Sequence, residues 1–324
     1  MGDAPLLVVE GLSTHYIGGR GTRVTRAVED VSFTLRDRET LGIVGESGSG
    51  KTTLALSLLR LLPPGAHIVA GAIRFEGEDL MAKSDREMRH IRGRRIAMIL
   101  QDPMASLNPL FTVGDQVAEP LRVHEGATRR GAWARARELL GAVRISAPNI
   151  RIRNYPHELS GGMRQRIVGA IAISCGPRLL IADEPTTSLD VTIQAQYLAL
   201  LRDLQRAQGL AMIFITHNLG IVARMCDMVA VMYAGRIVEA GPVRRIFDAP
   251  AHPYTRALIE SIPKMGDGNG RLTAIDGQPP DAAALPTGCA FHPRCPSRLD
   301  RCATERPSDT TVHAGHRVAC WLHR

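Results

Sequence analysis

The residues best suited to chemistry form a glycine-rich segment, residues 45–53, which reads GESGSGKTT. It lies between an apolar run, Leu41–Val44, and a helix-forming stretch, Leu54–Leu59. In the pattern G-x-x-x-x-G-K-[ST], glycines allow backbone N–H groups to surround phosphate oxygens, and the following helix adds positive potential at its N-terminus. The alternative is a Gly/Ser turn with a solvated lysine. We predict a phosphate-binding loop made of Gly45, Glu46, Ser47, Gly48, Ser49, Gly50, Lys51, Thr52 and Thr53.

Within this loop, Lys51 is expected to reach the β- and γ-phosphates of a nucleotide, and Thr52 to offer its hydroxyl to Mg²⁺. A carboxylate pair, Asp183 and Glu184, follows the apolar run Leu179–Ala182. We expect Asp183 to hold the Mg²⁺ and Glu184 to polarise the attacking water. The alternative is an acidic strand end that caps the next helix.

A parallel sheet would bring these groups together. Three apolar runs, at residues 96–100, 179–182 and 211–215, are continuous rather than alternating, and helical segments separate them. This pattern indicates strands buried on both faces. Each run ends in polar residues, and ligands bind beyond the carboxyl ends of such strands. We therefore expect Gln101-Asp102, Asp183-Glu184 and Thr216-His217 to converge with the loop on one site.

The remaining segments define the expected domains. We predict an edge strand at residues 6–12, a second strand at 31–35, a helix at 191–208 ended by Gly209, and a hairpin at 229–239. The sequence predicts an α/β P-loop domain at residues 1–249, with an antiparallel β edge and a helical subdomain at about 102–176. Residues 250–324, rich in proline and glycine, are expected to form a small irregular Cys-rich extension that cannot bury much of a core by itself.

Composition restricts the class of protein. A hydrophobic content of 44% fits a folded globular chain, and no apolar stretch approaches the roughly 18 residues of a membrane-spanning helix. The N-terminus lacks the features of a secretion signal, so we expect a soluble, cytosolic chain whose six cysteines form no structural disulfides. The net charge of +8 suits phosphate-bearing or acidic partners, although most of the arginines are expected to lie on a solvated surface.

A second glycine-rich segment is Leu159-Ser160-Gly161-Gly162-Met163. Ser160 can cap a helix, and the two glycines leave the helix N–H groups open, so this segment can form a second anion site. A capped helix without a ligand is the alternative.

Taken together, the loop, Gln101, LSGGMRQR at residues 159–166, the carboxylate pair, Ser188-Leu189-Asp190 and His217 resemble the nucleotide-binding subunits of ABC transporters, from Leu6 to about Phe247. The resemblance implies an ATPase in which two subunits face head to tail. Each Mg²⁺-bound ATP then lies between one subunit's loop and its partner's Ser160, Gly161 and Gly162, with Gln165 in the same helix. It also implies that Tyr16 stacks on adenine, Gln101 senses Mg²⁺ and water, Asp190 communicates across the dimer, and His217 contacts the γ-phosphate. Asn218 departs from the acid that many relatives carry after the histidine.

Three further stretches, residues 101–109, 251–258 and 288–296, resemble the bacterial dipeptide and oligopeptide importer ATPases. This resemblance implies two membrane permease subunits, a paralogous ATPase subunit or a second copy of this chain, and an extracytoplasmic peptide-binding protein. The chain would then lie at the cytoplasmic face of the inner membrane. A nickel or other small-solute importer is the alternative. A soluble ABC ATPase of DNA repair or translation is less expected, because neither a second cassette nor a coiled-coil insert is present, and we predict no nucleic-acid partner.

Four cysteines of the extension, Cys289, Cys295, Cys302 and Cys320, are spaced C-x₅-C-P-x₅-C-x₁₇-C. Four thiolates suit a zinc ion or an iron–sulfur cluster, and reduced cysteines without metal are a further alternative. We favour a [4Fe–4S] cluster over Zn²⁺, because the Cys-Pro step and the irregular spacing are typical of ferredoxin-type ligation. Either metal would hold together a segment poor in apolar residues.

Overall fold

The computed structural model describes residues 4–18, 23–262 and 275–324. The chain divides into two compact units. Unit 1 contains residues 1–35, 40–81 and 216–324, and unit 2 contains residues 36–39 and 82–215.

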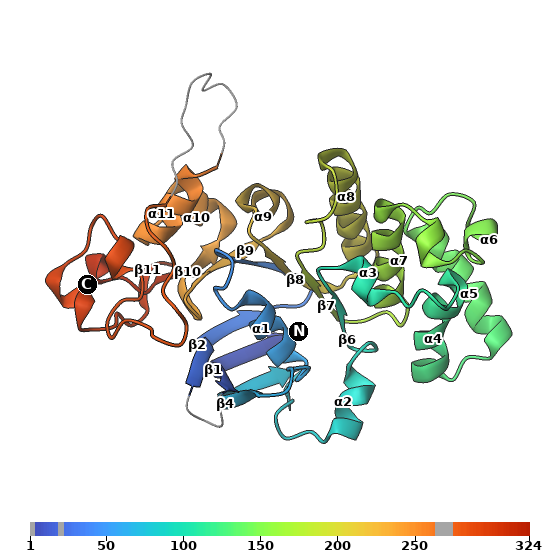
Figure 1. Ribbon diagram of the computed structural model, residues 1–324, viewed down its shortest axis with the longest axis horizontal. Helices are drawn as coiled ribbons and strands as arrows, with labels where there is room; N and C mark the ends of the chain where they lie inside the picture. The colour runs from blue at the N-terminus through green and yellow to red at the C-terminus, as the bar shows by residue number, and fades with distance from the viewer. Residues whose placement is uncertain (1–3, 19–22, 263–274) are drawn as a thin grey trace. The chain divides into compact units, whose positions relative to one another are not determined.

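Unit 1 contains an antiparallel sheet of four strands in the order β2-β1-β4-β5 (Figure 1). The strands are β1 (Leu7–Gly18), β2 (Arg23–Leu35), β4 (Ala66–Phe75) and β5 (Glu78–Asp79). The prediction of an edge strand at residues 6–12 is wrong, because Leu7 pairs with Leu35 of β2 on one side and with Phe75 of β4 on the other. Polar residues and Gly71 interrupt the alternation of β4, so its sequence gave no clear strand signal.

A second sheet in unit 1 begins with β3 (Thr40–Val44), whose five residues are all buried. It pairs in parallel with β9 (Met228–Tyr233), which forms the predicted hairpin with β10 (Arg236–Pro242). Two strands of the C-terminal extension, β12 (His316–Val318) and β11 (Thr310–His313), continue the sheet beyond β10. The helices of this unit are α1 (Lys51–Leu58), α9 (Leu219–Met225), α10 (Val243–Asp248) and α11 (Pro253–Glu260).

The C-terminal extension shares the hydrophobic core of unit 1. Phe291 and Tyr254 pack in one cluster with Val229, Tyr233 and Ile246, and Phe291 lies edge-on to Tyr233 with ring centroids 5.3 Å apart. A buried carboxylate also connects the segments. Glu239 of β10 accepts hydrogen bonds from the backbone N–H groups of residues 251 and 252 and from Nε2 of His316. The extension thus acquires a core by packing on the preceding strands.

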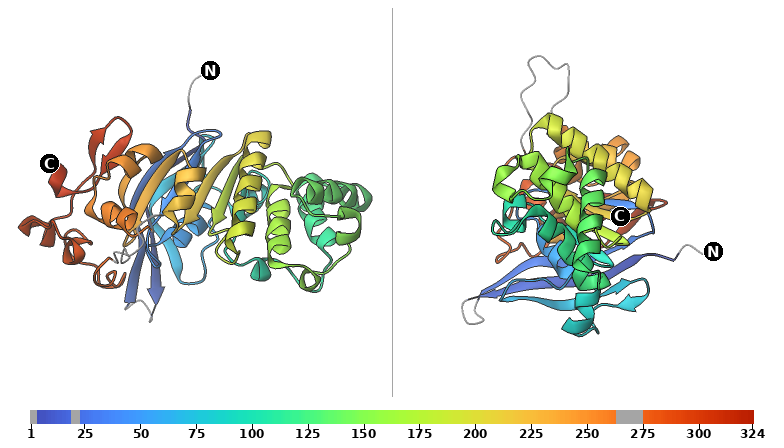
Figure 2. Two further views of the ribbon diagram at one scale, coloured as in Figure 1. Left: turned by 90° about the horizontal axis from the view of Figure 1, so that it is seen from above. Right: turned by 90° about the vertical axis from the view of Figure 1, so that its right-hand side faces the viewer.

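Unit 2 contains the predicted parallel strands, β6 (Ile96–Ile99), β7 (Leu179–Asp183) and β8 (Ala211–Thr216), with β7 paired to both others. Residues 102–176, all of them described, contain helices and no strand, as predicted. The helices of this unit are α2 (Asp85–Ile91), α3 (Pro103–Ser106), α4 (Val113–Glu125), α5 (Arg129–Ala142), α6 (Pro148–Arg151), the 3₁₀ helix η2 (Pro156–Glu158), α7 (Gly161–Ile173) and α8 (Val191–Gln208). Helices α4 and α5, drawn in green, and α7, drawn in yellow-green, pack side by side in Figure 2. In the parts of the chain that are described, no helix combines the length and the apolarity that membrane crossing requires.

Gly71 marks a close approach within the first sheet. Its φ is +97°, and a Cβ atom there would lie 2.5 Å from the Cα of Leu12, where the register between β1 and β4 shifts. Gly77, in the β4–β5 turn, also has positive φ (+80°) but faces open space.

We predict that Gly71→Ala destabilises the protein more than the matched variant Gly77→Ala. Gly77→Ala carries only the cost of a left-handed conformation, about 1–2 kcal/mol. Gly71→Ala adds a backbone collision and should cost about 3 kcal/mol or more. Thermal unfolding of the two variants beside the wild type measures the difference. Equal melting temperatures would contradict the packing described here.

Candidate functional site

The predicted phosphate-binding loop connects β3 to α1 in unit 1 and requires glycine at two positions. At Gly45, a Cβ atom would lie 2.1 Å from the carbonyl oxygen of Met232, and at Gly50 it would lie 2.0 Å from that of Ala27. Gly50 is the N-cap of α1 and has a φ of +99°. Contact with neighbouring backbone therefore fixes the path of the loop, which turns directly into a helix N-terminus.

The side chain of Lys51 is folded into this loop. It is only 6% exposed, and its Nζ donates hydrogen bonds to the carbonyl oxygens of Gly45 and Glu46, each at 2.8 Å. The Oγ of Ser49 is a third acceptor at 3.4 Å. The loop thus holds an ammonium group beside the positive end of α1, an arrangement that suits anionic phosphate.

The other predicted site residues of unit 1 belong to β1, to α1 and to the segment that follows β8 in the chain. Tyr16 is a half-buried residue of β1, and its hydroxyl is hydrogen-bonded to Oγ1 of Thr53 at 3.2 Å. Thr52 is exposed in the first turn of α1, and His217 is exposed directly after β8. Asn218 serves as the N-cap of α9 and accepts hydrogen bonds from two backbone N–H groups, which gives this departure from the family pattern a structural role.

Glu46 joins the loop to the C-terminal extension through contacts that the sequence analysis missed. Its backbone N–H donates to the Tyr254 hydroxyl at 2.9 Å, and its carboxylate accepts two hydrogen bonds from Arg294, at 2.7 and 3.1 Å. The Arg294 side chain is 5% exposed and also donates to the Tyr233 hydroxyl at 3.2 Å and to the carbonyl oxygen of Asp276 at 2.9 Å.

These contacts keep the participating groups in fixed protonation states. The hydrogen bonds with Glu46 raise the pKa of Arg294 above its ordinary value, so its guanidinium stays charged. Burial raises the pKa of the Tyr254 hydroxyl, which therefore stays protonated. Tyr254 and Arg294 lie 208 and 248 residues from Glu46. Both residues lie in stretches named above for their family resemblance, residues 251–258 and 288–296. The sequence therefore marked these stretches but did not show that they contact the loop.

In unit 2 the structure brings Gln101 and Glu184 together. Asp183 is the last residue of β7 and is 1% exposed, while Glu184 is half-buried with φ at +45°. The Glu184 carboxylate accepts hydrogen bonds from Nε2 of Gln101 at 3.1 Å and from the Thr187 hydroxyl at 2.9 Å. A left-handed conformation at a residue other than glycine costs about 1–3 kcal/mol and is concentrated at functional sites.

The second glycine-rich segment forms the N-terminus of α7. Ser160 is its N-cap, and its Oγ accepts a hydrogen bond from Met163 N–H. Ser160 and Gly161 are exposed, whereas a Cβ atom at Gly162 would lie 2.7 Å from Cγ2 of Ile193 in α8. Asp190 caps α8 and accepts from the N–H groups of residues 192 and 193. The side chain of Gln165 is 1% exposed, inside the packing around α7.

The four cysteines of the extension line one cavity of about 10 Å³, together with His252 and Trp321. Burial, together with the proximity of the other three cysteines, raises the pKa of Cys289 to about 11. Within the described ranges, no group of three or more histidine, cysteine or acidic side chains has a geometry that could hold a metal ion. The cysteines gather as predicted, but the metal-ligating arrangement expected from their spacing is not formed in this structure.

Two family models match parts of the chain. The family model described as "ABC transporter" matches residues 28–187, and the model described as "Oligopeptide/dipeptide transporter, C-terminal region" matches residues 238–302. A probable peptide ABC transporter ATP-binding protein of Sinorhizobium fredii is 51% identical over 318 residues, which cover 98% of this chain and 94% of that protein. The dipeptide transport ATP-binding protein DppD of Bacillus subtilis is 48% identical over 318 residues, with the same coverage.

Solved structures show the same fold. The ATP-binding cassette MJ0796, solved as a dimer bound to ADP and phosphate, matches with a TM-score of 0.66 at 24% identity, over 74% of this chain and 99% of that chain. The structure of cbiO1 from Clostridium perfringens, part of an ABC transporter complex, matches with a TM-score of 0.63 at 27% identity, over 76% and 92%. The chain therefore belongs to the ABC transporter family as one of its ATP-binding proteins. It is an ATPase with the predicted P-loop cassette fold, and the curated relatives named above are peptide and dipeptide transport proteins.

The contact between Glu46 and Arg294 yields a test by double-mutant cycle. We expect Arg294→Met and Glu46→Gln each to weaken ATP binding and lower stability, because each leaves the other partner of a partly buried charge pair without its ion pair. The double variant should lose less than the sum, with a coupling of about 1–3 kcal/mol. Titration with a fluorescent ATP analogue and chemical unfolding measure both effects.

Arg298→Gln, which removes an exposed arginine from the same segment, serves as the control and should behave as the wild type. Strictly additive losses in the double variant would show that Arg294 does not position the loop through Glu46.

Proposed function

We propose that this chain is the ATP-hydrolysing subunit of a bacterial importer for dipeptides and oligopeptides. The observation that carries the proposal is near full-length similarity, at 51% and 48% identity, to proteins named for peptide and dipeptide transport. The match of residues 238–302 to the C-terminal region of such transporters also supports the proposal. This extension packs into the core of unit 1 and contacts the phosphate-binding loop.

Each predicted site residue has a proposed role in binding or hydrolysing ATP. Lys51 and the loop N–H groups bind the β- and γ-phosphates of ATP, and Tyr16 stacks on adenine. Glu184 polarises the attacking water, and Gln101, hydrogen-bonded to it at 3.1 Å, orients the same carboxylate. Thr52, Gln101 and Asp183 are the proposed Mg²⁺ ligands. Their hydroxyl, amide and carboxylate oxygens suit this hard cation, which would neutralise phosphate charge when bound. His217, exposed after β8, contacts the γ-phosphate.

In a head-to-tail dimer, the partner's ATP would meet Ser160, Gly161 and Gly162. The exposed N-terminus of α7 supports this proposal, because unpaired helix N–H groups there favour an anion. Asp190 communicates between the subunits. The side chain of Gln165 is buried, so we propose that Gln165 supports these groups from within the packing around α7.

The proposed assembly contains two membrane permease subunits, a paralogous ATPase subunit or a second copy of this chain, and an extracytoplasmic peptide-binding protein. The chain would bind at the cytoplasmic face of the inner membrane and would need no nucleic acid. Within the chain, residues 1–249 form the proposed nucleotide-binding domain and residues 250–324 its peptide-importer extension.

Isolation of the intact complex from membranes tests this function. We expect permease subunits to co-purify and short peptides, delivered with the binding protein, to stimulate ATP turnover. Glu184→Gln should still bind ATP, while its turnover falls by about 10²–10⁴-fold because the polarising carboxylate is lost. Glu138→Gln, in an exposed ion pair on α5, is the matched control and should leave turnover unchanged. Stimulation by nickel and not by peptides, or co-purification with nucleic acid, would overturn the proposal.

We also propose that Cys289, Cys295, Cys302 and Cys320 ligate a [4Fe–4S] cluster, with Zn²⁺ as the alternative metal. The support is the convergence of all four side chains on one cavity, since four thiolates are a donor set that suits either metal. Because the cavity is about 10 Å³, the surrounding segment would have to rearrange when a cluster is assembled.

Purification without oxygen should give a brown protein with about four irons per chain and broad absorbance near 400 nm that dithionite bleaches. Cys302→Ala should abolish the absorbance, whereas Cys175→Ala, a cysteine of unit 2, should retain it. A colourless protein, or one zinc per chain, would contradict the cluster.

A further inference from the structure

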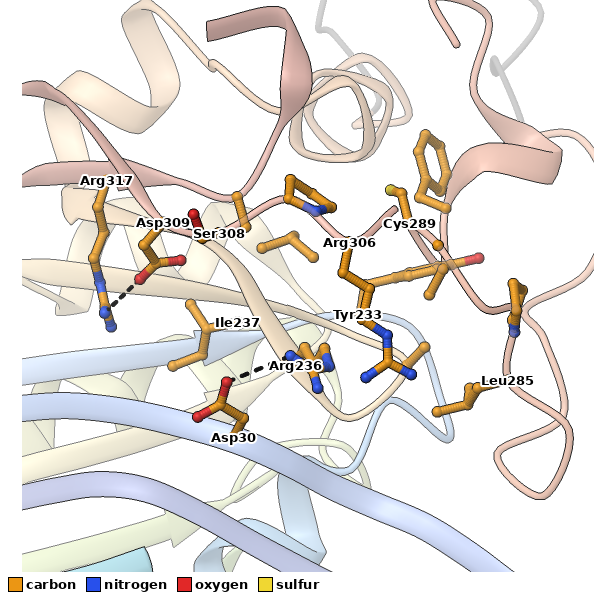
Figure 3. A pocket seen from close by; sticks show the side chains of 18 of the residues that line it. Asp30, Tyr233, Arg236, Ile237, Leu285, Cys289, Arg306, Ser308, Asp309 and Arg317 are labelled. Atoms are coloured by element: carbon orange, nitrogen blue, oxygen red, sulfur yellow. Dashed lines mark hydrogen bonds and ion pairs between the residues drawn. The ribbon is translucent and has the colours of Figure 1, made fainter. Parts of the chain in front are cut away.

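A cavity of about 310 Å³ lies within unit 1, and none of the loop residues 45–53 lines it. Residues of β2, β9 and β10 form one side, and residues of the C-terminal extension form the other (Figure 3). Much of its lining is apolar, with Ile237, Val238, Leu285, Pro286 and Phe291 among the contributing residues. At about 30 Å³ per water-sized group, the cavity has room for roughly ten such groups.

Arg236 enters this cavity from β10 with its hydrogen-bonding capacity largely unused. Its side chain is 30% exposed, and its ion pairs with Glu29 and Asp30 are both 3.6 Å long. These distances exceed those of hydrogen bonds. Within the described chain, the Arg236 guanidinium makes no hydrogen bond, so its donors remain available to an acceptor in the cavity.

Arg306 supplies a second guanidinium from the extension. It is exposed and, among the residues described, forms neither an ion pair nor a hydrogen bond. Burial lowers the pKa of Arg236 below its ordinary value, and the like charge of Arg306 lowers it further. Figure 3 shows both side chains lining this cavity. The cavity is therefore lined by two guanidinium groups with unused hydrogen-bond donors.

The opposite part of the lining is already neutralised. Arg317 forms an ion pair with Asp309 at 2.8 Å and donates to the carbonyl oxygen of Ser32, as the dashed line to Asp309 in Figure 3 indicates. At the other arginines, Glu29 and Asp30 both face Arg236 at long range, so the formal charges of these groups and Arg306 sum to about zero. Arg306 is nevertheless the guanidinium that, in the described chain, has no acid partner within ion-pair distance, and it lies beside an apolar wall.

We propose that this cavity binds a small organic anion: a carboxylate, held between Arg236 and Arg306, attached to a compact apolar body that packs on Leu285 and Ile237. A carboxylate matches the forked geometry of a guanidinium, and the apolar lining favours a hydrocarbon group over water. None of the predicted ATP-binding loop residues lines this cavity, so the proposal stands or falls independently of the proposed function.

The test uses the purified full-length chain and four probes at low salt, measured by isothermal titration calorimetry. N-acetyl-leucine carries both the carboxylate and the apolar body, and N-acetyl-leucine amide lacks the charge. Acetate has a carboxylate without the apolar body, and inorganic phosphate is an anion that lacks the carboxylate and the apolar body. We expect N-acetyl-leucine to bind at least about tenfold more tightly than each of the other three, because only it satisfies both the arginines and the apolar wall.

Arg306→Gln should weaken binding of N-acetyl-leucine by about tenfold or more, since an ionised partner of the carboxylate is lost. The side chain is exposed and without partners in the described chain, so this substitution leaves folding intact. Arg256→Gln on α11 removes the same charge outside the cavity and should bind as the wild type. Equal binding of the acid and its amide, phosphate binding as tight as N-acetyl-leucine, or an unaffected Arg306→Gln would each overturn the proposal.

Discussion

The predicted phosphate-binding loop is held from two directions, and its geometry depends on that restraint. On one side, the carbonyl oxygens of Met232 and Ala27 lie so close that only glycine fits at positions 45 and 50. On the other side, the two hydrogen bonds from Arg294 fix the carboxylate of Glu46. Paired hydrogen bonds between a guanidinium and a carboxylate are strong and directional, and here one partner is nearly buried. The loop is thus positioned by backbone contact and by charge.

This arrangement changes the role of the C-terminal extension. A segment of this composition could be an appendage, yet Tyr254, Phe291 and Arg294 place it against the same core and the same loop. The buried Glu239, which accepts from His316 and from two backbone N–H groups, attaches the rest of the extension to β10. Two of the four cysteines, Cys289 and Cys295, flank Arg294 in the chain, so the packing around the cysteines is connected to the phosphate-binding loop through a short stretch.

Features that depend on short, local sequence patterns could be predicted from the sequence. The loop, the carboxylate pair at the end of β7, the capped α7 and the Gly209-terminated α8 all depend on residues close together in the chain, and each lies where it was expected. Features that depend on contacts between residues far apart in the chain could not be predicted. The strand β4 has an interrupted alternation, so β1 was misjudged as an edge strand, and the ion pair between residues 46 and 294 has no periodic signature. Burial of Gln165 and the small volume at the cysteines are likewise products of packing.

We propose that ATP hydrolysis by this chain drives a peptide across a membrane. The most direct measurement is uptake of a labelled dipeptide into proteoliposomes that contain the complete transporter, with ATP on the side accessible to this subunit. We expect accumulation against a gradient with Mg²⁺ and ATP, and none with a non-hydrolysable analogue or with a Lys51→Ala subunit. Equal accumulation with the analogue, or with the Lys51→Ala subunit, would contradict it.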